Sequence, residues 1–163
     1  MLFGRIVSNE VVLNKGGLIA RDEWLKTAQM RLNIQLDEFV IMPNHIHGII
    51  IIDNDSRGTM HRAPTIPPHI PMIEQFGKPT PSSIPTIVRG FKSAVTNHIN
   101  QTRNTHGVPV WQRNYYEHVI RDEISLDKLR EYIRINPQKW AQDALYQADD
   151  EPVSGGISLM DHW

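Results

Sequence analysis

Two histidines, His45 and His47, stand one residue apart, just before an apolar run. Residues 49–52 of that run are all isoleucine, and β-branched side chains favour strands. Because successive side chains of a strand point to opposite faces, we expect both imidazoles on one face. Two neighbouring imidazoles on a rigid element are a common way to hold a divalent metal ion.

The alternative is a pair of ordinary histidines, half-buried or in a turn, that bind no metal. A His-x-His pair arises easily by chance in a chain with eight histidines. The apolar flanks favour the metal, because two polar rings buried in a central strand cost free energy unless something coordinates them or bonds to them.

A tyrosine with a polar partner one helical turn away is the second candidate group. Tyr132 and Asn136 are four residues apart in a predicted helix, so their side chains lie one above the other. Pro137 is expected to end that helix and to bias Asn136 away from the α-region. The alternative for Tyr132 is a core position beside Leu129 and Ile133.

Strands are expected in three places. Residues 4–13 contain two short β-prone pieces typical of a hairpin, which Gly16 and Gly17 would close. Residues 36–52 form a second predicted hairpin, with Pro43 and Asn44 as its tight turn. Residues 110–120 are aromatic and β-branched enough for a strand or an extended segment.

Three amphipathic helices are predicted, two of them between these strands and one after the last. The apolar spacing indicates one helix over residues 18–30 and a second over residues 84–100, with Ser82 and Ser83 as its cap. A third helix is expected to begin after Ser125 as its cap and to end at Pro137. Such helices pack their apolar faces on a sheet.

The net charge of −1 conceals an uneven distribution. Residues 1–80 carry eight basic and eight acidic side chains (sum 0), residues 81–140 carry nine and five (sum +4), and residues 141–163 carry none and five (sum −5). A basic segment of this kind suits a polyanion, although a solvated helix face is the alternative. The side chains expected to contact the phosphates of such a polyanion are Arg89, Lys92, Arg113, Arg121 and Arg134.

The chain fits one domain over residues 1–145. Residues 53–81 are rich in proline and are expected to form a long, mobile loop, and residues 146–163 an acidic, disordered tail. The chain has no cysteine, which excludes disulfides and thiolate sites. It has no apolar run of about eighteen residues and no signal-peptide pattern, so we expect a cytoplasmic protein without a membrane partner.

Four motifs in this order resemble the REP-associated tyrosine transposases, which are single-tyrosine members of the HUH superfamily. They are MPNHIHG at 42–48, VRGFKS at 88–93, WQRNYYEH at 111–118 and EYIRINP at 131–137. The resemblance covers about residues 35–145. It implies that His45 and His47 bind a metal ion, Mg²⁺ or Mn²⁺, that Tyr132 is the nucleophile, and that Asn136 is the third ligand where relatives carry Gln.

The implied activity is cleavage and transfer of single-stranded DNA at hairpin-forming repeats, through a 5′-phosphotyrosine and a free 3′-hydroxyl. The implied fold is α+β, a ferredoxin-like antiparallel sheet with helices packed on one face. Relatives carry a further strand ahead of the position where this chain starts, and without it the histidine strand would have an unpaired edge. The consequences expected from this difference are an inactive remnant, a misannotated start of the chain, or a dimer that covers the edge. The oligomeric state is expected to be a monomer or a homodimer.

Other interpretations of the same residues remain open. A sheet with a basic face could hold hairpin DNA or RNA without cutting it. The histidine pair could instead serve a metal hydrolase that uses water as the nucleophile. Tyr115 and Tyr116 have no polar partner one helical turn away, so we expect them to pack or to stack on bases rather than to act as nucleophiles.

Overall fold

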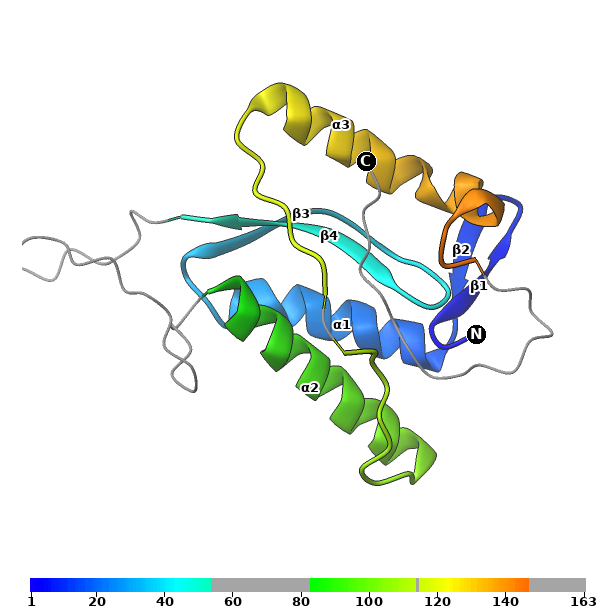
Figure 1. Ribbon diagram of the computed structural model, residues 1–163. Helices are drawn as coiled ribbons and strands as arrows, with labels where there is room; N and C mark the ends of the chain where they lie inside the picture. The colour runs from blue at the N-terminus through cyan, green and yellow to red at the C-terminus, as the bar shows by residue number, and fades with distance from the viewer. Residues whose placement is uncertain (54–82, 114, 147–163) are drawn as a thin grey trace, which may run out of the picture.

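The computed structural model of the chain describes residues 1–53, 83–113 and 115–146. The predicted loop after Asp53 and the tail after Tyr146 lie outside the described residues. The described part is α+β, as predicted, with antiparallel strand pairs (Figure 1). Its elements are β1 (Gly4–Val7), β2 (Glu10–Leu13), α1 (Lys15–Gln29), β3 (Ile34–Ile41), β4 (Ile46–Ile52), α2 (Ile84–Arg103), α3 (Glu123–Ile135) and the 3₁₀-helix η1 (Asn136–Gln142).

The hairpin of β1 and β2 turns at Ser8 and Asn9, whose φ angles are 52° and 67°. Two successive residues with positive φ are typical of the two-residue turns that match strand twist. The helix α1 then begins at Lys15, earlier than predicted, because Asn14 caps it by accepting a hydrogen bond from the Gly17 N–H at 3.1 Å.

Gly17 belongs to the first turn of α1 rather than to the end of the hairpin. A Cβ atom at this position would overlap the carbonyl oxygen of Phe3. The same oxygen accepts a hydrogen bond from the Asn14 N–H at 2.9 Å, so the backbone cannot easily move away. The glycine is therefore explained by the close approach of the N-terminal strand to α1.

The second hairpin joins β3 and β4, and Pro43 and Asn44 form its turn, as predicted. The Met42 N–H donates to the His45 carbonyl oxygen at 2.8 Å, which closes the turn. The Phe3 N–H donates to the Pro43 carbonyl oxygen at 2.9 Å. The N-terminal segment thus lies against the turn that presents the histidines.

Different helices cover the two faces of this hairpin. The His47 ring contacts Tyr132 of α3, whereas a Cβ at Gly48 would meet the Trp24 ring of α1. Because successive strand residues point to opposite faces, α1 and α3 lie on opposite sides of the hairpin (Figure 1). The structure thus differs from the prediction in two details: helices lie on both faces, and the described strands form two separate two-stranded sheets.

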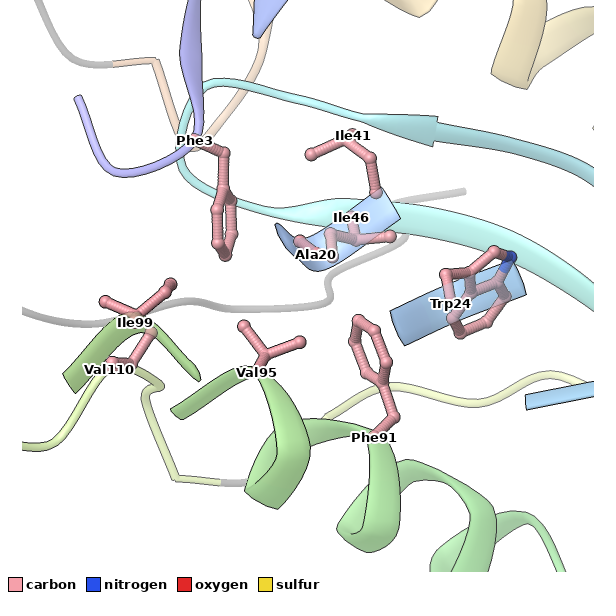
Figure 2. Close-up of a cluster of buried hydrophobic side chains, with 9 residues drawn as sticks. All are labelled: Phe3, Ala20, Trp24, Ile41, Ile46, Phe91, Val95, Ile99 and Val110. Atoms are coloured by element: carbon pink, nitrogen blue, oxygen red, sulfur yellow. The ribbon is translucent and has the colours of Figure 1, made fainter. Parts of the chain in front are cut away.

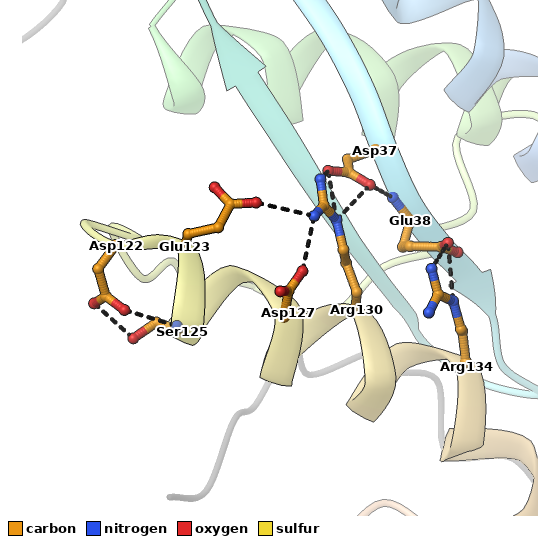
Figure 3. A network of polar contacts seen from close by, with 8 residues as sticks. All are labelled: Asp37, Glu38, Asp122, Glu123, Ser125, Asp127, Arg130 and Arg134. Carbon is orange, nitrogen blue, oxygen red and sulfur yellow. Dashed lines mark hydrogen bonds and ion pairs between the residues drawn. The ribbon is translucent and has the colours of Figure 1, made fainter.

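Two arginine–carboxylate pairs hold α3 against β3 (Figure 3). The Arg130 guanidinium donates to Asp37 at 2.7 and 3.1 Å, and Arg134 donates to Glu38 at 2.6 and 3.0 Å. The two acidic residues are consecutive, and both reach α3 because the register of β3 against β4 shifts at residues 37 and 38. The hydrogen bond from Arg130 lowers the pKa of Asp37 below its ordinary value.

The hydrophobic core lies between α1, α2 and the other face of the β3–β4 hairpin (Figure 2). The Trp24 ring packs edge-on against Phe91, with 5.3 Å between ring centroids, and tilted against Phe39 at 6.2 Å. This packing anchors the face of the β3–β4 hairpin that is opposite to His47. The buried cluster consists of Phe3, Ala20, Trp24, Ile41, Ile46, Phe91, Val95, Ile99 and Val110.

The α-helix α3 ends before Pro137, as predicted, but the predicted cap and the predicted conformation of Asn136 were wrong. Asp122, not Ser125, caps the helix, because its carboxylate accepts the Ser125 N–H at 2.8 Å. At the other end Asn136 is helical (φ −55°, ψ −42°), and the chain continues into η1. Pro137 occupies the first turn of η1, where a missing N–H costs nothing, so the proline changes the helix type without ending the helical run.

The segment of residues 110–120 is not a regular strand in its described part. Val110 is buried in the core, and the Trp111 indole N–H donates to the Lys92 carbonyl oxygen at 2.9 Å. Among the described strands, β4 has a single partner, β3. None of the described helices is both long and apolar enough to cross a membrane.

The close approach at Gly17 predicts a clear stability effect. Gly17→Ala should lower the free energy of unfolding by about 1–3 kcal/mol, because the new methyl group overlaps backbone atoms. Gly90→Ala is the matched control, since its Cβ would come no closer than 3.4 Å to the flexible end of Arg31. In the interior of α2 that substitution should stabilise by up to about 1 kcal/mol. Urea unfolding of both variants checks this, and equal effects would contradict the packing described.

Candidate metal centre and tyrosine

The two predicted ligand histidines are buried side by side where the turn enters β4. His45 is fully buried and His47 is 8% exposed. Their Nε2 atoms lie 2.8 Å apart, and the rings are nearly perpendicular. Two imidazole nitrogens on a common metal ion lie about 3.0–3.4 Å apart for bonds near 2.1 Å, so a small shift of the rings suffices to admit one.

Asn44 sets the orientation of His45, a role that the sequence did not indicate. The Asn44 side chain donates from Nδ2 to the Leu145 carbonyl oxygen at 2.7 Å, which directs its Oδ1 toward His45 Nδ1 at 2.8 Å. Since an amide oxygen only accepts, His45 carries its proton on Nδ1. In the neutral ring the Nε2 lone pair is then available to a metal ion, the usual arrangement of a ligating histidine.

Burial keeps both imidazoles neutral. Loss of hydration lowers the pKa of His45 from 6.5 to about 4. It lowers the pKa of His47 to about 3, to which the neighbouring His45 adds a smaller electrostatic contribution. At neutral pH each ring therefore carries only one proton, which leaves one nitrogen of each ring for a metal ion after a change of tautomer where needed.

Tyr132 lies against the histidine pair of its own chain. Its ring meets that of His47 nearly at right angles, with 5.4 Å between the centroids. The phenol is thus carried by α3 to the face of β4 that bears the imidazoles. Tyr115, by contrast, donates from its hydroxyl to Glu117 at 3.3 Å, and Tyr116 is 45% exposed.

Asn136 lies between the residues of the α3–η1 run that contact the two histidines. Tyr132 contacts His47, and Trp140 contacts His45 with 5.9 Å between ring centroids. Asn136 is four residues from each of them and is 3% exposed. Its Oδ1 atom is buried and finds no hydrogen-bond partner among the described residues. A buried amide oxygen without a partner costs free energy, which a cation at this position would recover.

Asp143 is a further charged residue at the centre, and it was not among the predicted ligands. Its Oδ2 lies 3.7 Å from His45 Nε2. The ligand atoms of His45, His47 and Asp143 all lie within 4.8 Å of one another. No local motif marks this aspartate, because it reaches the site only through the course of η1.

A cavity of about 970 Å³ lies along β4, and Tyr132 and His47 are among the residues that line it. It is lined by β4, by one face of α2 and by residues of the 111–123 segment, with Trp24 and Trp111 among its aromatic side chains. The volume lies at the upper end of the range typical of ligand pockets. The tyrosine therefore faces a space that can hold part of a substrate.

The five residues predicted to contact phosphates occupy different environments in the structure. Lys92 and Arg121 line the cavity, and the Lys92 ammonium lies 5.8 Å from the centre of the Trp111 ring. Partial burial lowers the pKa of Lys92. Arg89 and Arg113 are exposed and do not line this cavity. Arg134 is bound to Glu38 and helps to hold α3.

The lowered pKa values of the histidines predict acid sensitivity of the metal-free protein. At pH values between the pKa of His45 in the folded protein, about 4, and its ordinary value of 6.5, the unfolded chain binds more protons than the folded protein. The free energy of unfolding therefore falls as the pH falls from about 6.5 to 4. The loss from His45 is on the order of 3 kcal/mol. Urea unfolding with a chelator at several pH values measures it.

His45→Gln should weaken this dependence, because one of the two buried imidazoles that are forced to remain neutral is gone. The exposed His106 serves as the matched control, since His106→Gln removes a histidine outside the centre. A wild-type stability that is constant between pH 7 and pH 4 would contradict the burial of neutral imidazoles.

The chain is similar to an uncharacterized protein of Haemophilus influenzae. The two are 41% identical over 145 residues, which covers 89% of this chain and 77% of that protein. No family model matches the chain, and no solved structure matches it. The identity and coverage show that this chain belongs to the same family as the Haemophilus influenzae protein.

Proposed function

We propose that the protein is a metal-dependent endonuclease and strand transferase of single-stranded DNA, with Tyr132 as its nucleophile. The observation that carries the proposal is the contact between the Tyr132 and His47 rings within one chain. It brings a phenol to a pair of converging, buried imidazole nitrogens. The motif resemblance to REP-associated tyrosine transposases supports the same chemistry and suggests hairpin-forming repeats as the substrate.

The side chains of the centre fit Mg²⁺ or Mn²⁺. His45 and His47 offer their Nε2 atoms, and Asn136 offers the buried Oδ1 atom that has no partner among the described residues. An amide oxygen is a ligand that such hard cations accept, and imidazole suits Mn²⁺. When bound, the cation supplies Lewis-acid polarisation of a phosphate oxygen.

The role of Tyr132 is attack on a backbone phosphorus. A bond forms between Tyr132 Oη and phosphorus, and the bond between phosphorus and the 3′-oxygen breaks. The phenol loses its proton and the leaving 3′-oxygen gains one by way of solvent, so the products are a 5′-phosphotyrosine and a 3′-hydroxyl. Attack of another 3′-hydroxyl on the phosphotyrosine rejoins DNA and needs no ATP. Because a tyrosine ordinarily ionises at a pH of about 10, alignment by α3 contributes much of the rate.

The cavity along β4 supplies a path for the strand beside the scissile phosphate. Lys92 and Arg121 can neutralise phosphates, and Trp111 and Tyr115 add to the lining aromatic rings, the side-chain type on which bases stack. Stacking on aromatic side chains suits single strands, whose bases are free. The mixture of aromatic and basic groups in this cavity favours a single-stranded substrate over a duplex.

A covalent-adduct assay tests the proposal. The full-length protein is incubated with 5′- and 3′-end-labelled single-stranded hairpin DNA and Mn²⁺, and the products are separated on a denaturing gel. We expect a protein–DNA band that Tyr132→Phe and His45→Ala each reduce by about a thousandfold or more. Tyr116→Phe is the matched control and should leave the band unchanged.

Two other outcomes would replace the proposal with a different function. Retention of the hairpin without cleavage would indicate a binding module. Cleavage that survives in Tyr132→Phe would indicate a metal hydrolase that uses water. A covalent band that survives in Tyr132→Phe would show that another residue is the nucleophile.

A further inference from the structure

We infer that Asp143 is a direct ligand of the divalent cation, so that the centre consists of two imidazoles, one amide and one carboxylate. The inference rests on the metal centre of the proposed function and extends its ligand set. Asp143 lies outside the motifs that carry the resemblance, so its assignment depends on the structure alone.

The position of the carboxylate meets the first requirement of a ligand. Asp143 Oδ2 lies 3.7 Å from His45 Nε2, and the three ligand atoms of His45, His47 and Asp143 lie within 4.8 Å of one another. Atoms bound to one cation at about 2.1–2.2 Å are separated by no more than about 4.4 Å. Small adjustments of side chains therefore bring all three to a common ion.

The two oxygens of Asp143 have different environments. Oδ1 accepts the Leu145 N–H at 2.7 Å, which fixes the orientation of the carboxylate. Oδ2 is thereby directed toward the imidazoles, and no hydrogen-bond donor bonds to it among the described residues. Oδ1 is thus bonded to the Leu145 backbone N–H, and Oδ2 is the oxygen that would bind a cation.

The charge of Asp143 also needs a partner. Its side chain is only 11% exposed, and in the described residues no lysine or arginine forms an ion pair with it. A carboxylate removed from water without a counter-charge is costly. A divalent cation between the histidines would supply that charge.

Asn44 links His45 to the segment that carries Asp143 through hydrogen bonds. It bonds to His45 Nδ1 through its Oδ1 and to the Leu145 carbonyl oxygen through its Nδ2. Asp143 accepts from the N–H of that same Leu145. Asn44 is therefore a positioning residue, because its amide fixes the distance between the histidine turn and the segment that carries the carboxylate.

Mn²⁺ binding without DNA tests the role of Asp143 independently of cleavage. Asp143→Asn keeps the shape and the acceptor for Leu145 but removes the charge. It should raise the Mn²⁺ dissociation constant, measured by electron paramagnetic resonance of free Mn²⁺, by about tenfold or more, since loss of a mere supporting residue already costs that much. Asp127→Asn, at an exposed acid on α3, should leave the constant unchanged.

A second measurement needs no variant. The wild-type protein, labelled with ¹³C at its aspartate carboxyl groups, should show strong ¹³C coupling to bound Mn²⁺ in pulsed spectra, together with ¹⁴N couplings from imidazole. Imidazole couplings without the ¹³C coupling, or an unchanged affinity in Asp143→Asn, would overturn the inference and leave the tyrosine chemistry intact. A wild-type protein that binds no Mn²⁺ would overturn both.

Discussion

The burial of His45 and His47 is the constraint on which the other features of the site depend. Because the buried rings have lost their hydration, protein groups must provide hydrogen bonds that orient them. For His45 this group is the Asn44 side-chain amide. The neutrality of both rings follows from the same loss of hydration, which lowers the pKa of each. The hairpin can bury them because its other face is anchored in the core through Trp24.

The fold was predictable where local sequence signals agree with tertiary packing. Both hairpins and all three helices occur where turn residues and apolar spacing place them. That helices cover both faces of the β3–β4 hairpin was not predictable. Asp37 and Glu38 both bind arginines of α3, whereas in a regular strand two consecutive side chains would point to opposite faces. A register shift of this kind leaves no mark in composition.

The candidate site was predictable only as far as strand and helix periodicity extends. Alternation along a strand placed His45 and His47 on one face, and the contact of Tyr132 with His47 joins two of the predicted residues. Asn44 and Asp143 were missed. Asn44 was assigned only to the turn, and Asp143 depends on a helical run that continues past a proline.

The continuity of α3 and η1 has a mechanical consequence. Tyr132 lies in the last turn of α3, and Asn136 is both the C-cap of α3 and the first residue of η1. Arg130 and Arg134 fasten α3 to β3. A displacement of the end of α3 that separates the phenol from His47 would also shift Asn136, which caps the same helix. The positions of the phenol and of this buried amide are therefore coupled through the backbone.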